Sequence, residues 1–150
     1  MSQSIHEILK AYLLDLGKEV KDSRSKPYYE AYSGDSQPID IRSGRRHIEY
    51  SPDVIWERRG KLFIIEIALN EEWRSIVGEL TLAHLTKNSN GFLVITANWD
   101  SDYLGYLVSL VSEKLGRKWC GWINLEQEKL DDPEKAKLSI KSHIKKWGLI

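Results

Sequence analysis

Residues 51–69 read SPDVIWERRGKLFIIEIAL, and this stretch decides the fold class. We expect a strand over residues 47–56, a tight turn at Arg59 and Gly60, and a second strand over residues 62–69. The second run is apolar at nearly every position, which is typical of a strand buried on both faces of a sheet. The stretch therefore predicts a hairpin whose second strand lies inside the protein.

Helical and strand patterns alternate around this hairpin. Apolar residues recur at helical spacing over residues 4–20, whereas residues 21–46 are irregular, with short strands expected at 28–32 and 39–41. The other expected elements are helices over residues 71–87, 101–115 and 133–147 and strands over residues 92–96 and 118–123. This order favours an α/β fold, with a mixed central sheet of about four to six strands flanked by helices, in a single domain over residues 1–150.

The composition is that of a globular protein. With 41% hydrophobic and 29% charged residues, the chain is neither low-complexity nor disordered overall. No apolar run approaches the roughly 18–20 residues needed to cross a bilayer, so we expect a cytoplasmic protein without a membrane partner. The single cysteine, Cys120, excludes an internal disulfide framework and a cysteine-rich zinc site.

The formal net charge of zero hides two basic segments. Residues 41–61 carry six basic and three acidic residues, and residues 133–150 carry five basic residues and one acidic residue. Segments of this kind can contact phosphates, which makes Arg42, Arg45 and Arg46 candidate nucleic-acid-binding residues. The alternative is that both segments are solvated surfaces, because a dedicated nucleic-acid scaffold is usually more basic overall.

Two carboxylates in the hairpin are candidates for chemistry. Glu66 interrupts the most apolar strand of the chain, where a carboxylate is unfavourable unless it is paired, hydrogen-bonded or bound to a metal. Asp53 precedes it by 13 residues and one tight turn, so adjacent strands can bring the two together. Such a pair would bind a hard divalent cation, which can promote cleavage of a phosphodiester. Alternatively, Glu66 forms a structural ion pair with Arg45 or Arg46, and Asp53 only holds a turn.

Pro52-Asp53, the hairpin and the apolar strand carrying Glu66 resemble the PD-(D/E)XK nuclease superfamily, the fold of restriction endonucleases and archaeal Holliday-junction resolvases. That family has a core of helix–strand–strand–strand–helix–strand, similar to the order expected here over residues 4–97. The resemblance implies a restriction endonuclease-like core and a site for Mg²⁺ or Mn²⁺. It implies Asp53, Glu66 and the backbone carbonyl of Ile67 as ligands, with Glu7 on the first helix as a possible further carboxylate.

The sequence departs from the family motif at position 68. The motif has a lysine two residues after the glutamate, where it orients water and stabilises negative charge, but this chain has Ala68. Some members place the working cation on the following helix, where Arg74 is the nearest candidate, although an arginine stays charged and is a poor proton acceptor. Glu79 on the same helix occupies a position where some branches have a polar active-site residue. The alternative for Arg74 and Glu79 is simple exposure to solvent.

Other conspicuous residues have structural interpretations. We expect His84 to pack on the flank of a helix and Cys120 to be a small buried residue with no base beside it. Strand alternation places Trp119 and Trp122 on opposite faces of their strand. Either tryptophan could stack on a base, but packing in the core or in a dimer is favoured.

Three functions follow from these observations. The first is a metal-dependent endonuclease that hydrolyses nucleic acid, with DNA favoured, and that uses Asp53, Glu66 and Arg74. The second is a nuclease-fold protein without cleavage activity, acting as a nucleic-acid-binding or assembly subunit, which Ala68 favours. The third is a protein-binding module that uses exposed aromatic residues. A homodimer is expected only because members of the family commonly dimerise.

Overall fold

The computed structural model describes residues 4–19, 30–99, 103–116 and 118–148. Five strands form one sheet in the order β1-β4-β5-β6-β7: β1 (Glu30–Tyr32), β4 (Val54–Arg58), β5 (Lys61–Ala68), β6 (Ser89–Ala97) and β7 (Trp119–Leu125). β1, β4 and β5 are antiparallel, while β5, β6 and β7 run parallel. The predicted α/β class with a mixed sheet of four to six strands is therefore confirmed.

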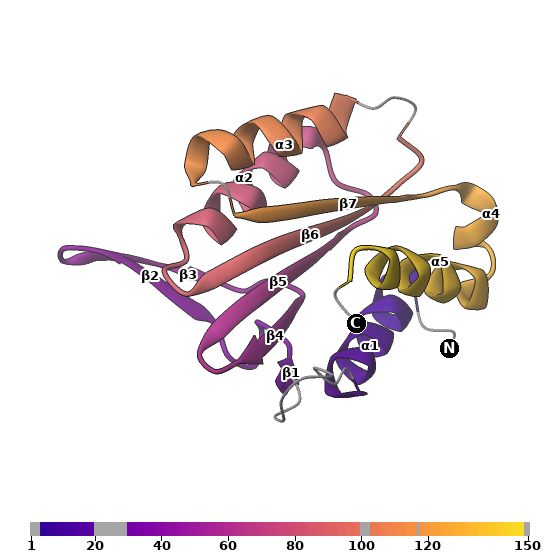
Figure 1. Ribbon diagram of the computed structural model, residues 1–150, viewed down its shortest axis with the longest axis horizontal. Helices are drawn as coiled ribbons and strands as arrows, with labels where there is room; N and C mark the ends of the chain where they lie inside the picture. The colour runs from indigo at the N-terminus through magenta and orange to yellow at the C-terminus, as the bar shows by residue number, and fades with distance from the viewer. Residues whose placement is uncertain (1–3, 20–29, 100–102, 117, 149–150) are drawn as a thin grey trace.

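Helices cover both faces of this sheet (Figure 1). α1 (Ile5–Glu19) and α5 (Pro133–Lys146) lie on one face, and α2 (Trp73–Leu85) and α3 (Tyr103–Leu115) lie on the other. Leu9 and Leu13 of α1 and Ile140 of α5 pack in one apolar core, whereas Ile76 and Leu80 of α2 belong to a second core on the opposite face. A short helix, α4 (Gln127–Leu130), precedes α5 and was not predicted.

The predicted strand over residues 47–56 is wrong as a single strand. It is broken at Ser51, Pro52 and Asp53 into β3 (Arg46–Tyr50) and β4. β3 pairs with β2 (Ile39–Ser43) in a separate two-stranded sheet, here called the β2–β3 ribbon. The physical reason is Pro52, which has no backbone N–H to donate to a strand partner.

Both hairpin turns follow from local backbone preference. Gly44 has φ +62° in the two-residue loop of the β2–β3 ribbon, where glycine adopts a left-handed conformation without steric strain. Arg59 and Gly60 have φ +53° and +77° between β4 and β5, as a type I′ turn requires at both central positions. The predicted turn at Arg59 and Gly60 is therefore confirmed.

Several sequence predictions lie at the margins of the described residues. Residues 28–29 of the first expected short strand, Val20 and the expected helix start at residues 100–101 lie outside them. Within the described residues, no helix is both long and apolar enough to cross a membrane. The element order in the main sheet, α1-β1-β4-β5-α2-β6, matches the order expected from the resemblance, with the β2–β3 ribbon inserted.

Candidate functional site

Asp53 and Glu66 lie together and are joined by two hydrogen bonds. The backbone N–H of Asp53 donates to Glu66 Oε1 at 2.7 Å, and the backbone N–H of Ile67 donates to Asp53 Oδ2 at 2.8 Å. This arrangement follows from the antiparallel register of β4 and β5, which places Val54 opposite Ile65. The alternative in which Glu66 pairs with Arg45 or Arg46 is wrong, because both arginines are exposed on the β2–β3 ribbon.

The loop that carries Asp53 is held from the other side by Gly34. The backbone N–H of Gly34 donates to the carbonyl of Pro52 at 2.9 Å. A Cβ atom at position 34 would lie 2.3 Å from that same oxygen, so only glycine allows this approach. The position of the Asp53 carboxylate is therefore fixed by contacts on both sides of its loop.

Two further carboxyl groups extend this pair into an acidic cluster, made of Asp53, Glu66, Glu71 and Glu79. Glu79 comes from the middle of α2 and contacts the carboxyl groups of both Glu66 and Glu71. Glu66 itself is only 6% exposed. Burial, with the charge of Asp53 adding to it, raises the pKa of Glu66, and burial together with the charge of Glu66 raises the pKa of Glu79.

Three buried polar atoms in this region lack a hydrogen-bond partner among the described residues. They are Glu71 Oε2, Glu79 Oε2 and the hydroxyl of Tyr50. Tyr50 is 4% exposed, and burial, followed by the charges of the cluster carboxylates, raises its pKa. Ionised carboxylates only accept hydrogen bonds, so contacts between them are favourable only when a proton or another cation is shared.

His6 and Glu7 approach the cluster from the first turn of α1. His6 Nε2 lies 3.4 Å from Asp53 Oδ1, and His6 Nδ1 lies 3.5 Å from Glu7 Oε1. Glu7, the possible further ligand, is mostly exposed. It contacts the ring of His6, and His6 in turn lies beside Asp53. His6, Glu71 and Tyr50 were not predicted as site residues from the sequence. The proximity of Tyr50 to the Pro52-Asp53 turn was the only available signal for any of them.

The cationic side chain predicted for the site, that of Arg74, does not lie there. Arg74 is exposed, and its guanidinium carbon lies 5.5 Å from the ring centroid of Trp73 rather than beside the carboxylates. Solvent exposure, the alternative considered for Arg74, describes it correctly, whereas the same alternative is wrong for Glu79. Ala68 is 1% exposed and packs in the core beneath α2.

The donor set fits a divalent cation in part. Across the described residues, no group of three or more His, Cys, Asp or Glu side chains is arranged so that it could hold a metal ion. Magnesium, however, is usually held by one or two carboxylates, with waters and substrate phosphates completing its coordination. Asp53 and Glu66 provide two carboxyl groups, and buried carboxyl oxygens of Glu71 and Glu79 without a partner lie beside them.

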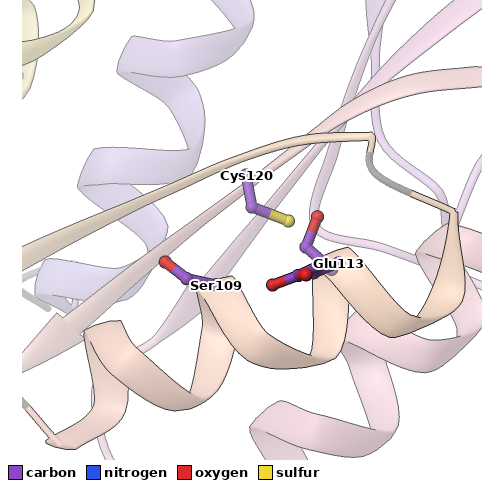
Figure 2. Close-up of a pocket in the computed structure, with 4 residues that line it drawn as sticks. Ser109, Glu113 and Cys120 are labelled. Carbon is purple, nitrogen blue, oxygen red and sulfur yellow. The ribbon is translucent and has the colours of Figure 1, made fainter.

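A pocket lies between α3 and β7, away from the acidic cluster (Figure 2). It has a volume of about 250 Å³ and is lined by Ser109, Ser112, Glu113 and Cys120. Cys120 Sγ lies 3.9 Å from Nε2 of His84, so the expectation that this cysteine has no base beside it is wrong. His84 is buried on the flank of α2, as expected.

This pocket is not a nucleophilic site. Burial raises the pKa of the Cys120 thiol and lowers the pKa of His84, so both groups favour their neutral forms. His84 Nε2 also lies 3.1 Å from Ser112 Oγ, and that hydroxyl donates to the carbonyl of Lys118 at 2.6 Å. The contacts join α2, α3 and β7, which is a structural role. Trp119 and Trp122 pack in opposite cores, as predicted.

No protein-family model matches this chain, and neither a curated protein nor a solved structure shows significant similarity to it.

Proposed function

We propose that this protein is a divalent-metal-dependent endonuclease that hydrolyses phosphodiester bonds of DNA at the acidic cluster. The observation that carries the proposal is the interlocked pair of Asp53 and Glu66, set beside buried carboxylate oxygens that have no partner. A buried group of like charges is unfavourable unless a cation or protons neutralise it. The resemblance to the PD-(D/E)XK superfamily supports the same assignment.

Asp53 and Glu66 would hold Mg²⁺ or Mn²⁺, with the carbonyl of Ile67 nearby. In a strand, the N–H and C=O of one residue point to the same side, so the Ile67 carbonyl also faces Asp53. The bound cation would supply the positive charge that stabilises a phosphodiester under attack by water. The backbone N–H groups of Asp53 and Ile67 orient the two carboxylates for this role.

Among the described residues, His6 places a ring nitrogen beside the site. Its Nε2 lies 3.4 Å from Asp53 Oδ1. An imidazole nitrogen can serve as a general base, so His6 is the candidate for the part played by the lysine of the family motif, which is replaced here by Ala68. Arg74 has no part in this proposal, because its guanidinium stacks on Trp73.

Calorimetric titration with Mn²⁺ and Mg²⁺, followed by cleavage assays on duplex and single-stranded DNA, tests the proposal. Asp53→Asn and Glu66→Gln keep the shape of each side chain and remove its charge. We expect each variant to lose metal binding and to reduce cleavage by at least about 100-fold, comparable to removal of one electrostatic group from an active site. Glu72→Gln changes an exposed acid at the start of α2 and is the matched control. Cleavage that survives in both variants would refute the proposal.

The burial of Ala68 favours a second function, a nuclease-fold protein that binds nucleic acid without cutting it. Burial, followed by the charges of neighbouring carboxylates, raises the pKa values of Glu66 and Glu79, and no cation of the described residues is among the causes. This alternative predicts salt-sensitive DNA binding and no cleavage in Mg²⁺ or Mn²⁺. Metal-dependent turnover lost in Asp53→Asn would exclude it.

A further inference from the structure

The β2–β3 ribbon extends away from the rest of the protein (Figure 1). Its base is anchored, because Tyr50 is buried and Ile39 and Ile41 pack against the core on the α2 side. Beyond this base the strands pair only with each other, from Ile39 opposite Tyr50 to Ser43 opposite Arg46. The ribbon is therefore an arm with a fixed root and an exposed tip.

Positive charge is concentrated at the tip of the ribbon, whereas Asp40 and Glu49 lie opposite each other nearer its root. Cross-strand partners lie on the same face of a ribbon, so Arg42 and His47 share one face while Ser43 and Arg46 share the other. Arg45 lies in the turn between them. No acidic residue occurs from position 42 to position 47.

The three arginines near the tip of the ribbon differ in their ion-pair partners. Asp40 hydrogen-bonds both Arg42 and His47, and the guanidinium of Arg42 holds the pKa of that carboxyl below its usual range. Arg45 and Arg46 form no ion pair with any described residue. Two exposed cations at the tip are thus available to a ligand.

We propose that the β2–β3 ribbon is an arm that enters the major groove of double-stranded DNA and places Arg45 and Arg46 at its tip against the phosphates. This inference rests on the proposed function and names its substrate as a B-form duplex. A groove bounded by two phosphate strands suits a tip whose Arg45 and Arg46 have no ion-pair partner among the described residues. The major groove of B-form DNA, about 12 Å wide, admits a two-stranded ribbon. The deep, narrow major groove of duplex RNA does not.

The length of the ribbon agrees with this placement. Arg45 is five residues beyond Tyr50, so the tip lies about 17 Å from the root at about 3.4 Å per residue. That reach exceeds the depth of the major groove, which is about 8.5 Å. Since Asp53 follows Tyr50 after only two residues, the root of the arm is close in the chain to the acidic cluster.

A groove between the ribbon and the end of α2 provides a second contact surface. It has a volume of about 360 Å³, with an apolar floor of Ile41, Ile48 and Leu85 and with Arg46 and His47 also in its lining. Ile48 and Leu85 are 54% and 55% exposed. Apolar side chains beside cations match the DNA backbone, which presents a deoxyribose next to each phosphate.

Fluorescence anisotropy with a 5′-labelled duplex of about 30 base pairs, in EDTA, tests the inference without cleavage. The test variant is Arg45→Ala/Arg46→Ala, and Arg45→Lys/Arg46→Lys retains the charge. Lys18→Ala/Lys114→Ala removes two exposed cations from α1 and α3 and is the control. The same measurement is made on one isolated strand and on duplex RNA of the same sequence.

We expect the double alanine variant to bind duplex DNA about 60-fold more weakly at 0.1 M salt and to reduce the salt-dependence slope by about 2, as loss of two phosphate contacts requires. The lysine variant and the control should bind nearly as the wild type. Far-ultraviolet circular dichroism checks that each variant is folded.

Unchanged duplex affinity in the alanine variant would overturn the inference, as would equal losses for duplex DNA, single strand and duplex RNA, or no duplex binding by the wild type. Failure of the nuclease proposal has a different signature. A chain that binds duplex DNA through Arg45 and Arg46 but never cleaves it keeps the ribbon assignment and loses the endonuclease activity. If the protein cleaves DNA equally well with and without Arg45 and Arg46, the endonuclease proposal stands and the ribbon assignment fails.

Discussion

Glu79→Gln should make the protein more stable at alkaline pH and flatten the dependence of its stability on pH. Glu79 contacts the carboxyl groups of Glu66 and Glu71, and a contact between carboxyl groups needs a proton to become a hydrogen bond. Glutamine has two amide N–H donors and can donate to both neighbours without taking up a proton. The substitution therefore preserves the shape of the side chain and removes the need for protonation.

The size of the effect follows from proton linkage. Burial and the charge of Glu66 raise the pKa of Glu79, so the folded protein holds a proton that the unfolded chain releases above an ordinary glutamate pKa of about 4.3. Each retained proton lowers the free energy of unfolding by about 1.4 kcal/mol per pH unit above that value. Over pH 5 to pH 8, one fully retained proton amounts to about 4 kcal/mol, and the loss ends once the pKa of the folded protein is passed.

Urea denaturation in EDTA at pH 5, 6, 7 and 8 measures this slope directly. The free energy of unfolding of the wild type should fall as the pH rises. The slope for Glu79→Gln should be smaller by about 1.4 kcal/mol per pH unit, which corresponds to one proton. Glu72→Gln, an exposed acid on the same segment, should retain the wild-type slope. Parallel profiles for wild type and Glu79→Gln would refute the shared proton and, with it, the description of the cluster as strained by its own charge.

Two further predictions concern the scaffold. Gly17→Ala places a Cβ atom 2.4 Å from Nε1 of Trp56, so we expect a loss of about 1–3 kcal/mol in urea denaturation. Gly78→Ala, which has nothing within 4 Å of the new atom in α2, should instead gain about 0.5–1 kcal/mol, and equal effects would contradict the packing argument. Thr96→Val removes the acceptor of the Trp122 indole N–H at 2.7 Å, and thermal unfolding should show a loss of about 1–3 kcal/mol. An unchanged melting temperature would show that this hydrogen bond is replaced.

The fold could be predicted from periodicity, because the buried strands are nearly continuous apolar runs. Residues 62–69 correspond to β5 and residues 92–96 lie within β6, and both strands are buried along most of their length. The β2–β3 ribbon was predicted only in part. Apolar residues alternate at Ile39 and Ile41 and at Ile48 and Tyr50, and strands were expected at residues 39–41 and within 47–56. Their pairing in a separate sheet depends on the Gly44 turn and on the break at Pro52, which alternation alone does not indicate.

Part of the candidate site could likewise be predicted from the sequence, and part could not. Asp53 and Glu66 could be paired from sequence because one hairpin connects them, and a hairpin fixes which residues are adjacent. Glu79 and His6 reach the same place from helices on opposite faces of the sheet, and helix packing is not encoded in local spacing. Sequence reasoning identified Glu79 as a candidate but could not decide between exposure and burial, and it did not identify His6.

Position 68 links the charge of the site to its chemistry. Residues two apart in a strand share a face, so Glu66 and Ala68 both point toward α2. A lysine there would place an ammonium group among the carboxylates, whereas Ala68 contributes only packing against Ile76 and Leu80. The cluster therefore has to be neutralised by protons or by a bound cation. Because both would neutralise the same carboxylates, the proposed metal binding should compete with protonation and strengthen as the pH rises.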